Sequence, residues 1–138
     1  FGILGSYSDT RSSVKPQGPG TSQPLPGLSR YVSNITLYYE KSGFSTRVSQ
    51  RSRSAFIGEI QGFGADRETR YIQGEDLIDF QASYAFSGDW DGLSILLQVN
   101  NVTNEAYQEF FRDPGTPDRP RSYNEYGRTY LLGATYKF

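Results

Sequence analysis

The closing segment Gly127–Phe138 constrains the fold most, because its side chains alternate between apolar and polar up to the final residue. One face carries Tyr130, Leu132, Ala134, Tyr136 and Phe138. A period of two is the side-chain period of a β-strand. An aromatic terminus inside such a strand is typical of a strand whose apolar side faces lipid and whose last ring lies at a membrane interface.

The same alternation predicts five earlier strands. They are Phe1–Ser13, Ser29–Glu40, Phe44–Ile57, Glu75–Ser87 and Leu93–Tyr107. Long polar connections are expected at Val14–Leu28, Gly58–Gly74 and Gln108–Tyr126, and short turns at Lys41–Gly43 and Gly88–Gly92. No helix is predicted. Because long and short connections alternate, the sequence predicts an up-and-down antiparallel meander with its long loops at one end, as in outer-membrane barrels.

Composition excludes several functions. A mean hydropathy of -0.61, without an apolar run near eighteen residues, excludes a transmembrane helix but leaves a transmembrane β-barrel open. The absence of His and Cys removes Ser-His-Asp catalysis and thiolate metal sites, and a net charge of -1 gives no case for nucleic acid. We therefore expect no enzyme, cofactor or metal. The first residues lack the basic start and the cleavage site of a signal peptide, so the chain is either cytoplasmic or a fragment of a longer protein, and we expect a fragment.

The apolar faces also predict the register. An Arg or Lys on the lipid face near the bilayer midplane costs roughly 2–4 kcal/mol. The predicted register keeps charge off the apolar faces of the last three strands, whereas a one-residue slip would turn Asp79 and Lys137 outward. The third strand fits less well, since polar residues at 50, 52 and 54 follow Val48. We therefore expect only Phe44–Gln50 of that strand to lie in hydrocarbon.

Two motifs carry a family resemblance. The segments Asn100–Tyr107 and Tyr126–Tyr130, with the aromatic terminus, resemble the C-terminal end of TonB-dependent outer-membrane receptors. Earlier segments at Pro26–Ser29 and Asn34–Glu40 are similar to the strands that precede that end, so the resemblance spans essentially residues 1–138.

The resemblance implies the last six antiparallel strands of a roughly 22-stranded barrel with a plugged lumen. Its loops would be extracellular, its short turns periplasmic, and its location the bacterial outer membrane. Such receptors import a scarce nutrient (a siderophore, cobalamin or an oligosaccharide) and do no chemistry on it. The plug and the segment that contacts TonB would lie upstream, outside this chain.

The terminal strand also resembles the signal that the barrel-assembly machinery reads. Gly133, Tyr136 and Phe138 occupy the expected places. Leu131 stands where that signal usually begins with a polar residue. The resemblance therefore implies outer-membrane lipid and the assembly machinery as partners.

Three arginines, Arg47, Arg51 and Arg53, share the polar face of the third strand and are predicted to face the lumen. They fit a basic ladder that guides an anionic substrate or pairs with acidic plug residues. A hydrated barrel interior with local counter-charges is the other interpretation, and the one we expect.

The richest loop is Gln108–Tyr126 with its flanking aromatic residues. Its candidate substrate-binding residues are Tyr107, Phe111, Arg112, Asp118, Arg119, Arg121 and Tyr123. Aromatic stacking beside Arg and Asp hydrogen bonds is what recognition of a sugar or an aromatic siderophore uses. A loop that only folds over a barrel mouth has the same composition. Aromatic residues at the short-turn end, Trp90 among them, predict an interfacial girdle.

A soluble β-sandwich that binds a ligand or carbohydrate is the alternative. Both folds contain antiparallel strands, but a sandwich buries its apolar faces against a second sheet and a barrel gives them to lipid. Six strands cannot close a wide barrel, so the isolated transporter segment would expose two sheet edges and an apolar face.

Overall fold

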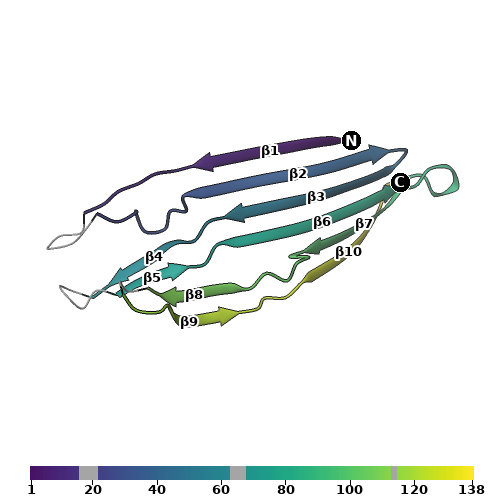
Figure 1. Cartoon of the computed structure of the whole chain (residues 1–138). Coiled ribbons are helices and arrows are strands. Elements are labelled where there is room, and N and C mark those ends of the chain that lie inside the picture. Colours follow the sequence, from purple (N-terminus) through teal and green to yellow (C-terminus); the bar gives the residue numbers. More distant parts are fainter. Residues whose placement is uncertain (16–21, 63–67, 113–114) are drawn as a thin grey trace.

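The computed structural model describes residues 1–15, 22–62, 68–112 and 115–138, which form two antiparallel sheets and a short 3₁₀ turn, η2 (Gly88–Trp90) (Figure 1). The prediction of an all-β antiparallel fold is confirmed. Parts of the predicted loops Val14–Leu28, Gly58–Gly74 and Gln108–Tyr126 lie outside the described residues. Within the described ranges, no helix has the length and apolarity needed to cross a membrane.

The larger sheet has six strands in the order β1-β2-β3-β6-β7-β10. They are β1 (Gly2–Asp9), β2 (Tyr31–Lys41), β3 (Phe44–Arg53), β6 (Glu75–Ala85), β7 (Leu93–Asn100) and β10 (Thr129–Tyr136). Each described strand pairs with its neighbours antiparallel, and the sheet is open, with β1 and β10 as its edges. Several predicted ends were too late: β1 stops at Asp9, β3 at Arg53 and β7 at Asn100.

A second, four-stranded sheet corrects the prediction that 58–74 and 108–126 are loops. Its strands are β4 (Phe56–Gln61), β5 (Glu68–Ile72), β8 (Tyr107–Phe111) and β9 (Arg119–Asn124), in the order β4-β5-β8-β9. Hairpins β4–β5 and β8–β9 join through β5 and β8, and the sheet prolongs β3, β6, β7 and β10 at the long-connection end (Figure 1). The prediction failed because these strands are short and charged and contain Pro120, which are loop signals locally; their strand state comes from the pairing.

Asn101 forms the break between β7 and β8. Its backbone has a φ of 55°, a conformation that Asn tolerates better than most residues. The side-chain amide donates to the carbonyls of Glu105 and Gly127, both at 3.1 Å, and its oxygen accepts from the Glu105 N–H at 2.8 Å. The Asn101 N–H donates to Asp79 at 3.0 Å. One residue thus ties the β7–β8 junction to β6 and to the segment before β10.

The short turns bring the chain back at the opposite end. Gly43, with a φ of 81°, closes the β2–β3 hairpin and lies against the Ala85 carbonyl. Gly92, with a φ of 90°, lies against Lys137, whose N–H donates to the Gly92 carbonyl at 2.9 Å. A side chain at Gly43 would strike the Ala85 carbonyl, and one at Gly92 would strike the Lys137 carbonyl, so both close approaches require glycine.

The described residues contain almost no hydrophobic core. Ile57, with 2% of its surface exposed, is the one fully buried apolar residue among them. In the described part of the chain the two sheets continue one another end to end, and their strands do not pack face to face. The six-stranded sheet is therefore a single layer, whereas globular domains are built from packed layers around a core.

Candidate functional site

The apolar side chains of neighbouring strands meet on one face of the six-stranded sheet. Leu37 lies opposite Val48, Val48 opposite Phe80, Phe80 opposite Val99, and Val99 opposite Tyr130. Directly paired residues point to the same side of a sheet. The register is therefore the predicted one.

This apolar face is uncovered. Leu37 is 52% exposed, Leu97 40% and Leu132 76%, although the first two lie on inner strands of the sheet. Exposed apolar patches on soluble monomers rarely extend beyond a few hundred Å². A face of this kind requires an apolar environment outside the described chain.

Aromatic side chains on the apolar face form two rows. The turn-side aromatic row comprises Tyr39, Phe44, Tyr84, Phe86, Tyr136 and Phe138. Its rings pair as Tyr39–Phe44 (6.4 Å), Tyr84–Phe86 (4.8 Å) and Tyr136–Phe138 (5.9 Å). The loop-side aromatic row comprises Tyr31 and Tyr130, and the Tyr7 ring stacks on Tyr31 at 6.3 Å from the turn side of the row. Between the two rows the apolar face carries Phe80 together with aliphatic residues such as Val48 and Leu97.

The loop-side row runs obliquely across the strands. Following the pairs above, Tyr130 is level with Leu37, which is six residues beyond Tyr31 on β2, and four strand-to-strand steps separate β2 from β10. At about 3.3 Å per residue and about 4.8 Å per strand, the offset is about 20 Å over about 19 Å. The row therefore crosses the strands at about 45°, and the strands make the same angle with a line drawn perpendicular to the row.

The turn-side row has the same slope. Tyr39 is level with Leu132 through Thr46, Ala82 and Leu97, and Phe138 is again six residues farther along the chain. Two parallel rows with one slope would define a band of constant height across the sheet. Eight residues separate Tyr31 from Tyr39 and Tyr130 from Phe138, which at about 45° makes the band about 19 Å high between Cα positions.

One charged residue of β6, Asp76, lies on the apolar face, where the predicted register placed no charge. Asp76 lies opposite Ser52, and the slope of the rows puts it beyond the loop-side row. The polar residue Gln50 of β3 lies on the same face, and its side-chain amide donates to both Asp76 oxygens at 2.8 and 3.0 Å. The polar end of the third predicted strand is therefore hydrogen-bonded to a carboxylate on the loop side of the band.

The three predicted lumen-facing arginines lie on the opposite, polar face. Arg51 pairs with Asp79 at 3.0 Å and Arg53 with Glu75 at 2.8 Å, each across β3 and β6. Arg47 lines a cavity of about 210 Å³ with Asp79 and other polar residues. Two of the three arginines therefore have the local counter-charges that a hydrated interior contains.

The predicted substrate-binding residues are divided between two faces of the four-stranded sheet, because neighbours along a strand point to opposite sides. One face, the Phe111 face, carries Phe111 beneath two guanidinium groups: Arg119 at 5.7 Å and Arg121 at 5.5 Å from the ring centre. Arg119 also pairs with Glu68 at 3.0 Å, and Arg121 with Glu109 at 3.5 Å.

Glu109 organises the Phe111 face, and the sequence analysis missed it. It accepts a hydrogen bond from the Tyr107 hydroxyl at 2.9 Å and pairs with Arg70 at 3.7 Å as well as with Arg121. Burial, and then the hydrogen bond to Glu109, raises the pKa of Tyr107. The available signal was its position two residues from both Tyr107 and Phe111, since a strand through 107–111 would place all three on one face.

The other face, the Arg112 face, carries a bidentate ion pair. Arg112 donates to the two Asp118 oxygens at 2.9 and 2.6 Å and lies 5.2 Å from the Tyr71 ring and 5.0 Å from the Phe110 ring. The two rings are stacked at 5.8 Å. The hydrogen bond from Arg112 holds the pKa of Asp118 below its ordinary value, and the same bond raises the pKa of Arg112.

Tyr123 and the terminal residues take separate positions. The Tyr123 hydroxyl donates to Glu125 at 2.7 Å, which raises the pKa of Tyr123. Gly133 lies opposite Leu96 on the polar face of the edge strand β10. Tyr136 and Phe138 belong to the turn-side aromatic row. The structure therefore gathers no single pocket from the residues singled out in the sequence.

Comparison of the chain with protein-family models, with curated proteins and with solved structures found no match.

Proposed function

We propose that the chain is the C-terminal part of the wall of a TonB-dependent outer-membrane receptor. The observation that carries the proposal is the uncovered apolar face bounded by two parallel aromatic rows. Transmembrane barrels have an outward apolar band flanked by aromatic girdles. The proposed location is the bacterial outer membrane, with lipid against the apolar face.

The slope of the aromatic rows supports this proposal independently of the family resemblance. If both rows lie at membrane interfaces, the strands tilt about 45° from the membrane normal, within the 35–45° range of barrels. The rings extend the band beyond its height between Cα positions, towards the roughly 25 Å of a barrel's apolar belt. A soluble sandwich has no reason to align aromatic residues along one oblique line.

The polar face and the four-stranded sheet take the transport roles in this proposal. The polar face, with Arg47, Arg51 and Arg53, lines the lumen. The four-stranded sheet rises on the extracellular side, and its Phe111 and Arg112 faces are the surfaces available for a siderophore, cobalamin or oligosaccharide. Import is driven from the inner membrane through TonB, which contacts segments upstream of this chain.

The edge strand β10 closes the barrel in this proposal. Its free edge would pair with the first strand of the complete barrel, and its terminus with Gly133, Tyr136 and Phe138 would be read by the barrel-assembly machinery. Pairing removes the open sheet edges that otherwise promote aggregation.

Vesicle partitioning of two matched triple variants tests the membrane-facing assignment. The first replaces three leucines of the apolar face by serine: Leu37, Leu97 and Leu132. The second replaces three leucines of the polar face by serine: Leu4, Leu96 and Leu131. Each half-exposed leucine that enters hydrocarbon contributes about 1 kcal/mol, so the first variant should partition about two orders of magnitude more weakly than the parent. The second should lose less than tenfold.

Equal losses in the two variants would contradict the assignment. A parent chain that is monomeric, melts cooperatively without detergent and does not bind vesicles would instead establish the soluble sandwich.

A further inference from the structure

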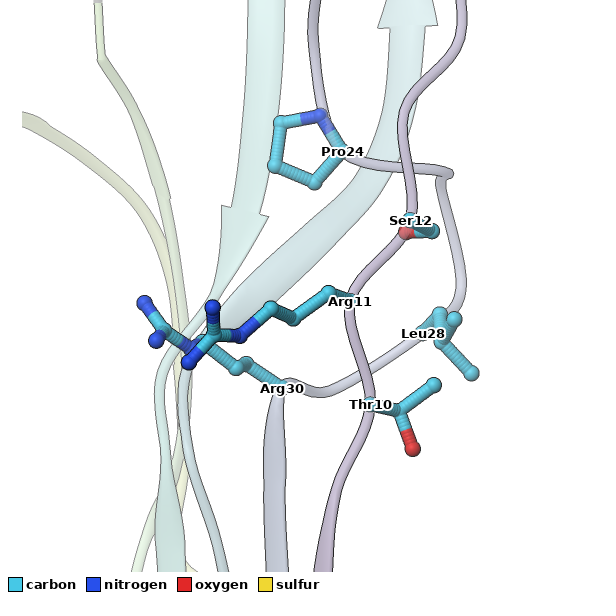
Figure 2. A pocket seen from close by; sticks show the side chains of 6 residues that line it. All are labelled: Thr10, Arg11, Ser12, Pro24, Leu28 and Arg30. Carbon is cyan, nitrogen blue, oxygen red and sulfur yellow. The ribbon is translucent and has the colours of Figure 1, made fainter.

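A small cavity of about 290 Å³ lies where β1 ends and β2 begins. We call it the Arg11–Arg30 pocket; its lining residues are Thr10, Arg11, Ser12, Pro24, Leu28 and Arg30 (Figure 2). Figure 2 shows the two arginine side chains extending in the same direction, away from Leu28. The cavity is at the lower limit for a whole small-molecule ligand but has room for a lipid headgroup.

The pocket carries an excess of positive charge. Asp9 is the shared partner of both guanidiniums, with Arg11 at 3.5 Å from one carboxylate oxygen and Arg30 at 3.5 Å from the other. Charge-assisted N–H···O bonds are usually 2.7–2.9 Å, so both contacts are loose. Elsewhere on the sheet Arg51 and Arg53 have a carboxylate each at 3.0 and 2.8 Å. Asp9 is thus shared by two arginines, whereas Asp79 and Glu75 each pair with one.

Hydrogen-bond donors complete the arrangement. A guanidinium has five N–H donors in a planar fork that matches phosphate geometry. The Ser12 hydroxyl accepts from the Leu25 N–H at 3.0 Å, which leaves its own hydrogen to donate. Leu28 and Pro24 add apolar carbon surface to the lining of the same cavity. The chemistry fits a phosphate group attached to a carbon skeleton.

The pocket lies at the height of the loop-side aromatic row. Tyr31 is opposite Asp9, and Arg30 lies 4.7 Å from the Tyr31 ring. The row shifts by six residues over four strand-to-strand steps, or one and a half residues per strand. One further step from Tyr31 places the row just after β1, between Thr10 and Arg11. Interfacial Tyr rings sit at headgroup level.

We propose that the Arg11–Arg30 pocket binds the phosphate of a membrane-lipid headgroup whose acyl chains lie along the apolar face. Arg11 and Arg30 hold the phosphate oxygens, Ser12 donates a hydrogen bond to the phosphate, and the phosphate displaces the loose contacts of Asp9. The lipid source rests on the proposed membrane location, and a free phosphate is the other source of the same chemistry.

Lipid titration of the full chain in neutral maltoside micelles tests the proposal, with bound lipid counted by native mass spectrometry. The probes are phosphatidic acid, diacylglycerol without the phosphate, and inorganic phosphate alone. Phosphatidic acid should bind saturably and more tightly than the other two. The double variant Arg11→Gln/Arg30→Gln should lose roughly 30-fold in affinity, since each basic residue near an anionic surface contributes about 5.5-fold.

Two further variants make the result specific. The control Lys41→Gln/Lys137→Gln removes the same charge at the short-turn end and should keep the parent affinity. Asp9→Asn removes the internal competitor for the guanidiniums and should tighten binding about fivefold. A gain cannot come from misfolding.

Three results would overturn the proposal: equal losses in the two double variants, no preference for phosphatidic acid over diacylglycerol, or equally tight binding of inorganic phosphate. Failure of the membrane assignment has a different signature, because the chain would then be monomeric without detergent and would take up neither lipid.

Discussion

An arginine at the middle of the apolar band is the most demanding perturbation of the proposed membrane face. On β2, Ile35 lies four residues from Tyr31 and four from Tyr39, the residues of the two aromatic rows, and its side chain is 44% exposed. At about 3.3 Å per residue and a tilt of about 45°, its Cα lies about 9 Å from each row. Ile35 is therefore the midplane position of this strand.

The expected cost follows from that depth. A lipid-facing Arg at the midplane of a barrel costs roughly 2–4 kcal/mol, and one near an interface about 0–1 kcal/mol. Ile35→Arg should therefore reduce the folding equilibrium constant by about 30- to 900-fold. Tyr39→Arg should cost about 1–2 kcal/mol, which includes the loss of its ring contact with Phe44 at 6.4 Å.

A control on the opposite face isolates the lipid contribution. Thr36 lies on the polar face and shares a 3.0 Å hydrogen bond with Ser49, so Thr36→Arg should cost only about 1 kcal/mol. The assay is equilibrium unfolding in urea of each variant folded in neutral detergent micelles. The lipid-facing assignment is contradicted if Ile35→Arg costs no more than Thr36→Arg, or if Tyr39→Arg costs as much as Ile35→Arg.

Three other predictions concern the junction, the Arg112 face and the terminus. Asn101→Gly keeps the positive φ but removes three side-chain hydrogen bonds, so it should destabilise by about 2–3 kcal/mol, whereas Asn104→Gly, at a φ of 57°, should be nearly neutral in the same urea assay. The pKa of Asp118, measured by NMR titration of its carboxyl carbon, should lie below its ordinary value and return to it in Arg112→Gln; the stabilisation from this pair is present at neutral pH and lost as pH falls through the lowered pKa. Deleting Phe138 should reduce insertion by reconstituted barrel-assembly machinery several-fold, and unchanged insertion would argue against the signal role.

The six strands of the larger sheet were predictable because period-two alternation is a local signal that survives without tertiary information. The register followed from the same pattern, since a slip by one residue would have exchanged the faces of Asp79 and its neighbours. Strand ends were less predictable. The segment after Asn100 reads as a continuing strand, although its asparagines are the residues that most readily take a positive φ and so mark a turn.

The four-stranded sheet and its two faces were not predictable from local patterns. The Glu109/Phe110 position carries a register shift relative to β9, so the side to which Arg121 points depends on pairing rather than on residue spacing. The separation of Arg112 with Asp118 from Phe111 with its arginines follows from that pairing. The contact of Arg11 and Arg30 with Asp9 was likewise not predictable from the sequence, because residues 11 and 30 come together only when β1 pairs with β2.

Spin-label accessibility along β2 tests the membrane-facing claim most directly. The chain contains no Cys, so single Cys substitutions at residues 34–39 each carry one nitroxide. In detergent micelles the proposed barrel wall predicts oxygen accessibility that peaks at 35, 37 and 39 and accessibility to a water-soluble nickel chelate that peaks at 34, 36 and 38. Labels at 35 and 37 that neither reagent reaches, as in a protein core, or that both reach without alternation, would contradict a lipid-facing β2.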